Sequence, residues 1–253
     1  MWTSLGPNAG LILISLSIGA MVGAAGVGGF LMPMALTLIT SISLHEGTAT
    51  SLFTFIFIGL AGTIYFQHKG SINWSLVWPI CAGAAVTGFA GAWVGSLLSP
   101  VILSLVLATL IIIAGAYTFF SSAYNVIFKL PQGGKKEWVT LATIGAVTGF
   151  LSGMTGIGGP ALSVPLMVLF GFSILTAIGV GQVLQIVGAL SGTIANLQMG
   201  TIDFGLASFI CVFEIFGVLL GAYLLHRMDS ALIKKMVGTL CLVAGFALIF
   251  RTL

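Results

Sequence analysis

The stretch that most constrains the fold is an apolar run at residues 9–41, broken in its middle by Gly26-Val27-Gly28-Gly29. As one continuous helix, this run would measure roughly 48 Å, against about 30 Å of bilayer hydrocarbon. Such a segment either crosses the membrane as a tilted, kinked helix or dips in and returns as a re-entrant hairpin. Glycine allows the sharp turn of a hairpin because it adopts backbone angles that other residues avoid.

Composition places the whole chain in the membrane. Of the 253 residues, 58% are hydrophobic and only 5% are charged, whereas a soluble domain carries about 25% charged residues. The apolar runs are long enough for helices rather than for barrel strands, which predicts an all-α integral membrane protein in contact with the lipid bilayer. No basic cluster of the kind that binds nucleic acid is present. The first residues lack the basic segment of a cleaved signal peptide, so the first run is expected to be part of the structure.

The broken run returns in the second half of the sequence. Gly156-Ile157-Gly158-Gly159 repeats Gly26–Gly29 at an offset of 130, and the same ungapped offset pairs Cys81 with Cys211. One register that runs through several segments predicts an internal duplication. The first repeat is expected at 1–124, with a hairpin at 9–41 and spans at 48–67, 75–98 and 100–123. A linker is expected at 125–137. The second repeat is expected at 138–253, with a hairpin at 138–171 and spans at 174–198, 203–226 and 230–251.

The basic residues favour re-entrant hairpins over crossings. If both broken runs crossed the membrane, five basic residues would lie on one side and three on the other. If both are hairpins, seven share one side and only Arg251 is opposite, which is the bias of real topologies. Each half then has three full spans, so the second half is inserted upside down, as in secondary transporters with inverted repeats. We expect a multi-pass protein of the cytoplasmic membrane, with both termini outside and the linker 125–137 in the cytoplasm.

The two Gly-rich turns, named here the first tip (residues 26–29) and the second tip (residues 156–159), are the strongest site candidates. Where the chain leaves helical geometry inside a bilayer, its N–H groups need partners. The returning helices are expected to begin near Phe30 and Pro160, and helix N-termini attract anions. Two tips that meet at the midplane predict an anion site without lysine or arginine, formed by Gly26, Gly28, Gly29, Gly156, Gly158 and Gly159. The alternative is that these glycines are close helix-packing contacts.

Polar side chains near the tips are further candidates for contact with the substrate. Thr48, Thr50 and Ser51 lie early in the segment after the first hairpin, and Thr155 lies at the second tip. Gln182 and Gln185 are three residues apart and therefore share one helical face. Buried glutamines need several partners, so this pair is expected to line the pathway. The alternative for each of them is hydrogen bonding between helices.

Glu214 is the one acidic residue well inside an expected span. An intramembrane carboxyl group suggests function, and proton coupling is the hypothesis for it, although its repeat counterpart is Ala84. The three cysteines lie in apolar runs without metal-ligand spacing, so no metal site and no cofactor are expected. Motifs of intramembrane enzymes are missing, so no catalytic residues and no enzyme activity are expected.

These motifs resemble the TauE/SafE family of sulfite exporters and related permeases. The resemblance rests on the first tip with Pro33, on the segment Gly47-Thr48-Ala49-Thr50-Ser51-Leu52, and on Gly70-Ser71-Ile72-Asn73-Trp74, which is answered by Gly200-Thr201-Ile202-Asp203-Phe204. It implies a secondary transporter that exports sulfite, an organosulfonate or a related small anion, driven by an ion gradient. The tips and the Thr-Ser segment would be its transport elements. Val180-Gly181 stand where the first repeat has Thr50-Ser51, so the site is expected to be less symmetric than the fold.

A second class of function stays open from the sequence, namely a passive channel or a carrier of a neutral or cationic solute. The sequence does not distinguish sulfite from sulfate, thiosulfate or sulfonates as the substrate. It also leaves open whether H⁺ or Na⁺ is the coupling ion, the direction of transport, whether the chain forms a homo-oligomer, and any role of Cys81 and Cys211.

Overall fold

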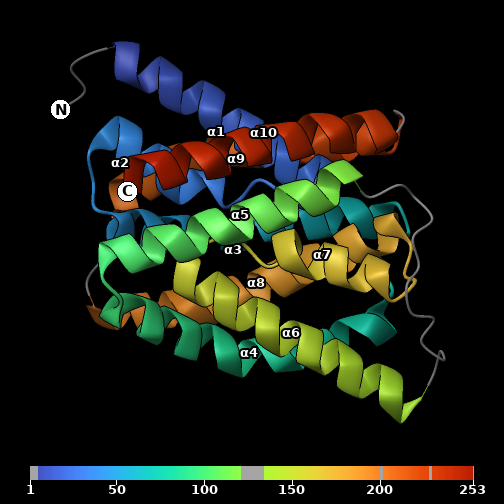
Figure 1. Cartoon of the computed structure of the whole chain (residues 1–253). Helices are drawn as coiled ribbons and strands as arrows, with labels where there is room; N and C mark the ends of the chain where they lie inside the picture. The colour runs from blue at the N-terminus through green and yellow to red at the C-terminus, as the bar shows by residue number, and fades with distance from the viewer. Residues whose placement is uncertain (1–4, 121–133, 200–201, 228–229, 253) are drawn as a thin grey trace.

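The computed structural model describes residues 5–120, 134–199, 202–227 and 230–252, and these residues form helices and short connections without a strand. The chain is therefore all-helical over its described part, as predicted. Figure 1 shows the helices lying side by side in one bundle. In chain order they are α1 (Leu5–Ala25), α2 (Leu31–Thr40), α3 (Leu44–His68), α4 (Trp74–Leu97), α5 (Pro100–Phe120), α6 (Lys135–Thr155), α7 (Pro160–Leu169), α8 (Ile174–Met199), α9 (Phe204–Leu225) and α10 (Ser230–Thr252).

Capping side chains start the long helices at the same place in each half. Ser43 caps α3 by accepting a hydrogen bond from the Glu46 amide at 3.2 Å, and Ser173 accepts one from the Thr176 amide at 3.2 Å at the start of α8. Such side chains satisfy N–H groups that the first helical turn leaves free. Asn73 and Asp203 do the same for α4 and α9. The helix starts therefore recur at an offset of 130 because the capping residues do.

The last residues of the linker predicted at 125–137 are helical. α6 begins at Lys135, so Lys135, Lys136 and Glu137 form its first turn. These residues are good helix formers, and Glu137 at the helix N-terminus is favoured by the helix dipole. Their polarity marks exposure rather than the absence of a helix. Residues 121–133, which include the rest of the predicted linker, lie outside the described residues.

The helices of one half pack against helices of the other. α1 lies along α9, and α6, its counterpart at the offset of 130, lies along α4. In the same way α3 contacts both α8 and α9, and α8 contacts both α3 and α4. In Figure 1, α5 and α10 lie side by side, as α4 and α6 do. The pairing is thus the same when the two halves are exchanged.

Glycines bring the backbones of these helix pairs into direct contact. A Cβ added at Gly23 of α1 would overlap the Val218 carbonyl of α9, and one at Gly153 of α6 would overlap the Gly88 carbonyl of α4. Gly23 and Gly153 are repeat counterparts. Lipid chains supply no hydrophobic drive for helix association, so close contact of small residues is the main source of affinity between helices.

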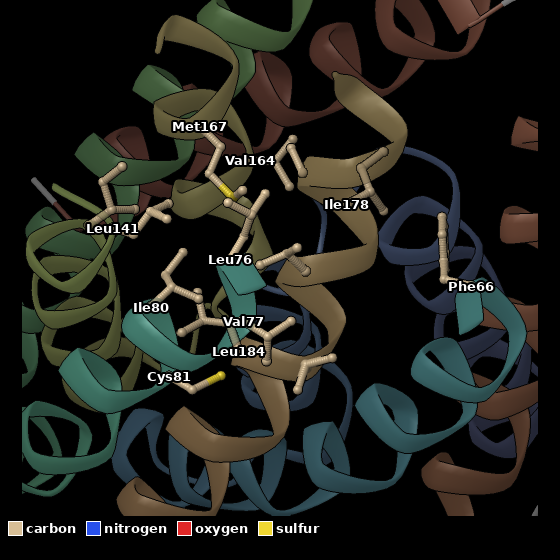
Figure 2. Packing of buried hydrophobic residues seen from close by; sticks show 14 of the residues in the cluster. Phe66, Leu76, Val77, Ile80, Cys81, Leu141, Val164, Met167, Ile178 and Leu184 are labelled. Atoms are coloured by element: carbon tan, nitrogen blue, oxygen red, sulfur yellow. The ribbon is translucent and has the colours of Figure 1, made fainter. Parts of the chain in front are cut away.

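The largest buried cluster of apolar side chains joins α4, α7 and α8. Figure 2 shows Ile80, Val164, Ile178 and Leu184 among its members. On the outside of the bundle, large apolar side chains are exposed instead; Trp78, for example, is 71% exposed. An apolar outer face of this kind is stable only against lipid.

Six described helices are long and apolar enough to cross a bilayer, namely α3, α4, α5, α6, α8 and α9. The set includes α6, which the sequence assigns to a re-entrant hairpin. It omits α10, some of whose side chains are outside the description. α1 contacts α2 and α6 contacts α7 across the two tips, but helix length and composition do not decide how deep these pairs lie. The re-entrant hairpins and the inverted insertion therefore stay predictions.

The topology can be tested with single cysteines in a background whose native cysteines are replaced by alanine. In Figure 1 the start of α1 and the end of α10 lie at the left, and the start of α6 lies at the right. We expect Lys135→Cys and Arg227→Cys to react with a membrane-impermeant thiol reagent from the same face, and Ser43→Cys to react from the other. Reaction of the first two from opposite faces would rule out the hairpin topology.

Close packing of α4 on α6 predicts the effect of one added methyl group. A Cβ at Gly91 would overlap the carbonyl of Phe150 and lie 2.8 Å from its carbon, so Gly91→Ala must push the helices apart. Overpacking of this kind costs about 1–3 kcal/mol, measured as a lower apparent Tm in detergent. The control is Gly188→Ala, whose new Cβ meets nothing within 4 Å and which gains up to about 1 kcal/mol of helix propensity. Equal shifts for both variants would contradict the packing.

Candidate functional site

The two tips have matching backbone conformations that require glycine. Gly26 and Gly156 both have φ of +68°, and Gly28 and Gly158 have φ of +119° and +85°. These angles strain any residue with a Cβ. Gly26, Gly28, Gly156 and Gly158 are therefore turn residues, in contrast to Gly23 or Gly153, which lie within helices and make packing contacts.

The tips touch each other inside the bundle. A Cβ added at Gly29 would lie 2.7 Å from the carbonyl oxygen of Ile157, and one at Gly26 would lie 3.4 Å from the Pro160 side chain. The ring of Phe55 on α3 adjoins both tips, 3.0 Å from the Cβ position of Gly29 and 3.3 Å from that of Gly158. Phe55 is fully buried. The structure thus brings together two segments that are 130 residues apart.

Several N–H groups at the tips have no hydrogen-bond acceptor among the described residues. The amides of Gly26 and Gly156 donate to Val22 and Ser152, which continues the helix by one bond. No bond of this kind leaves the next three amides of either tip within the described part of the chain. All of these residues are buried. The free donors belong to Val27, Gly28, Gly29, Ile157, Gly158 and Gly159.

Gln182 and Gln185 extend from α8 to α1 and α3. The Gln185 amide donates to the Phe55 carbonyl oxygen at 3.3 Å, and the Gln182 amide donates to that of Val22 at 3.4 Å. Both side chains are buried, and neither carbonyl oxygen has a partner among the described residues. The Gln185 oxygen lies 3.8 Å from the Cβ position of Gly158, so this residue is at the second tip. Gln182 contacts Gly62 instead, farther along α3.

The predicted hydroxyl groups are mostly engaged elsewhere. Ser51 donates to Gly47 at 2.7 Å, Thr155 donates to Leu151 at 2.6 Å, and Thr50 accepts from the amide of Asp203 at 3.2 Å. Thr48 differs from them. Its buried hydroxyl has no partner in the described structure, and its side chain lies 3.0 Å from the Cβ position of Gly156. The atom of this side chain nearest to Gly156 is the methyl carbon, so Thr48 lies against the second tip and carries the unpartnered hydroxyl of this group.

A cavity of about 370 Å³ leads to the second tip. It is lined by His45, Thr48, Ala92, Gly95, Ser96, Gly153, Met154 and Asn196. His45 and Ser96 lie at the start of α3 and the end of α4, and Met154 and Thr48 lie beside Gly156. The cavity therefore runs from one end of the bundle to the tip region.

The first tip borders a much smaller space. About 20 Å³ remains between Ala24, Ala25, Val27, Tyr117, Val164, Pro165, Val168, Ile174, Ile178 and Leu225, which is room for about one water molecule. A larger cavity of about 930 Å³, lined by Lys135 and Trp138 among others, lies at the start of α6 and includes no tip residue.

Glu214 lies in the middle of α9 and is fully buried. Its backbone adjoins Gly19 of α1, and the side chain of Thr54 on α3 faces its carboxyl group. The Thr54 hydroxyl donates to Ser51 at 3.0 Å, and both carboxyl oxygens lack a partner within the described ranges. Ser15, one turn before Gly19, is also buried, with a hydroxyl that has no partner there. Glu214 is not among the residues that line the tip cavities.

Positive side chains and metal-binding clusters are both distant from the tips. The basic residues whose side chains are described are all exposed: Lys69, Lys135, Lys136, Arg227 and Lys235. The described residues include no group of three potential metal ligands, and Cys81 and Cys211 are free and buried apart from the tips. The polar character of the tips comes from the backbone.

One residue at the tips, Phe55, was not among the candidates from sequence, while Thr48 was named there as part of the Thr-Ser segment. Phe55 is the repeat counterpart of Gln185, so the offset of 130 could have identified it. Thr48 belongs to the same Gly-Thr-Ala-Thr-Ser segment as Thr50 and Ser51, and only the rotation of α3 about its axis separates their roles.

Comparisons with known proteins agree with a membrane transport function. Residues 3–118 match the family model described as sulfite exporter TauE/SafE. The probable membrane transporter protein YunE of Bacillus subtilis is 24% identical over 94% of this chain and 95% of its own length. The probable membrane transporter protein YjnA of the same organism is 26% identical over 94% of this chain and 98% of its own. The probable membrane transporter protein y4hK of Sinorhizobium fredii is 29% identical over 58% of each chain. No solved structure matches.

Proposed function

We propose, from the match of residues 3–118 to the family model described as sulfite exporter TauE/SafE, that this protein is a secondary transporter of a small sulfur-containing anion. The cargo is sulfite or an organosulfonate, and the direction is export across the cytoplasmic membrane. The anion is held between the first tip and the second tip by backbone N–H groups.

The observation that carries this proposal is the set of six free, buried N–H groups at the two tips. A polar group left without a hydrogen bond in the bilayer costs several kcal/mol. An oxyanion has several acceptor atoms, so one bound ion can satisfy several donors at once. α2 and α7 also begin at the tips, and the positive ends of their dipoles favour a negative charge there.

The charge distribution supports an anion held without a positive side chain. The basic residues with described side chains lie exposed at helix ends, so they cannot clamp the ion at the tips. Binding by backbone dipoles alone is weaker than binding by lysine or arginine, which suits a carrier that must release its cargo. The cavity of about 370 Å³ beside Thr48 is in the size range of small-molecule sites.

Glu214 is the best candidate for the residue that binds the coupling ion. A buried carboxylate without a partner is costly, and binding of a proton or Na⁺ removes that cost. Thr54 and Ser15 supply nearby oxygen atoms for either ion. Glu214 lies on the helix that packs along α1, and α1 leads directly to the first tip, so loading of this site is linked to the tip through one helix.

The alternative is a passive channel or a carrier of a neutral or cationic solute. It is favoured by the unpartnered oxygens of Glu214, Gln182 and Gln185, because oxygen atoms attract cations and donors rather than anions. In that case the tips would have a purely structural role.

Flux measurements in proteoliposomes distinguish the two. We expect sulfite or a small sulfonate to be transported, and Thr48→Val to weaken its binding because one hydroxyl donor to the anion is lost. A hydrogen bond to a charged group contributes about 1.5–3 kcal/mol, or roughly 10- to 150-fold in Kd. Gly28→Leu should abolish transport, since a side chain at φ of +119° distorts the tip. Glu214→Gln should still bind the anion, as followed by thermal shift, and should lose only the dependence on the ion gradient.

Gly188→Ala is the control for this series, because its Cβ meets nothing within 4 Å and the residue contacts neither tip. Uptake of a cation or neutral solute that survives Gly28→Leu but is lost in Glu214→Gln would contradict the proposal and support the alternative.

A further inference from the structure

The cavities at the two tips are lined by repeat counterparts. Three residues of the large cavity at the second tip correspond, at the offset of 130, to three residues of the small cavity at the first tip. The pairs are Met154 with Ala24, Thr48 with Ile178, and Gly95 with Leu225. The two cavities therefore occupy corresponding places in the two halves. The one at the second tip is open, with about 370 Å³, and the one at the first tip is almost filled, with about 20 Å³ left.

The two cavities approach the tips from opposite ends of the bundle. The large cavity begins at Ser96, near the end of α4, and the small cavity lies toward Leu225, at the end of α9. The end of α4, where the large cavity begins, lies at the left of Figure 1, beside the start of α5. The small cavity lies toward the end of α9, which is the counterpart of α4. α5 ends at the right, where Tyr117 lines the small cavity. We call these the Ser96 end and the Leu225 end.

The contacts at each tip show what fills the small cavity. At the second tip, Thr48 lies on Gly156 through its methyl group, next to open space. At the first tip, Ile178 and Val164 lie on Gly26, at 3.5 Å and 2.8 Å from its Cβ position. Ile178, Val164 and Leu225 belong to one buried apolar cluster, part of which is visible in Figure 2. An apolar plug of this kind excludes both water and ions.

We infer that the two cavities are the two access paths to the tip site, here open at the Ser96 end and closed at the Leu225 end by Ile178, Val164 and Leu225. The inference rests on the proposed function only in taking the tips as the binding site. Because the two halves pack alike, the opposite state is reached when the region around Thr48 closes and the region around Ile178 opens. A carrier of this type never has both paths open, which separates it from a channel.

Accessibility of single cysteines tests this without any substrate. In the background whose native cysteines are replaced by alanine, Thr48→Cys should react with a small, charged methanethiosulfonate reagent added at the Ser96 end. Its counterpart Ile178→Cys should react at least about tenfold more slowly than Thr48→Cys, because the plug leaves space for only about one water molecule. Equal rates in the two variants would overturn the closed state.

The role of Leu225 in the plug is tested by replacing it with glycine, the residue that stands at the corresponding position of the open cavity. Leu225→Gly places at position 225 the residue type of its counterpart, Gly95. It should raise the reaction rate of Ile178→Cys about tenfold, because it shifts the population toward the state that is open at the Leu225 end. The reagent should act from the Leu225 end. Leu224→Gly is the matched control, since it makes the same change one residue away, outside the cavity lining, and should leave the rate unchanged. Leu225→Ala serves as a milder variant if the glycine lowers the yield of folded protein.

An unchanged rate in both Leu225 variants, or reaction only from the Ser96 end, would overturn the assignment of the plug. A protein that labels as expected but moves no sulfite or sulfonate would instead count against the proposed function and leave the access paths standing.

Discussion

Unpaired backbone amides in the interior of a membrane protein are the constraint from which the rest of this structure follows. A helix hides its N–H groups from lipid, and a break in a helix exposes them. Here two breaks expose them at the same place, because Gly29 of one tip contacts Ile157 of the other. Pairing the breaks concentrates the exposed donors in one small volume, away from lipid. The surrounding helices bury these donors.

Glycine has two separate roles in this chain, and position in the helix distinguishes them. At Gly28 and Gly158 it permits a backbone conformation, while at Gly91 and Gly153 it permits contact between helices. A sequence motif alone does not tell these roles apart, since both appear as glycines at short spacing in apolar runs. The structure separates them through the sign of φ and the nature of the nearest atom. The glycines of this chain therefore serve two purposes, namely turns with positive φ and close packing of helices.

Much of the fold could be predicted from the sequence because its causes are local or periodic. Apolar length and capping residues such as Ser43 and Asp203 set helix bounds to within a few residues, and the offset of 130 located both tips. The side chains around the tips were harder to assign, because Thr48, Thr50 and Ser51 are all buried and the hydrophobic pattern does not tell which of them faces the tip. The difference between the two cavities depends on Ile178 standing where the other half has Thr48. It is a packing result, visible only when both halves are in place.

The pairing of α1 with α9 and of α6 with α4 has a mechanical meaning. Each pair is held together by backbone contacts at glycines, so each pair behaves as a rigid beam. Yet each beam takes one helix from either half of the sequence. The predicted sequence repeat therefore does not coincide with these packed pairs. A change of shape that keeps the glycine contacts would move one helix of each half together, so the boundary between the moving parts would run through each half rather than between the two.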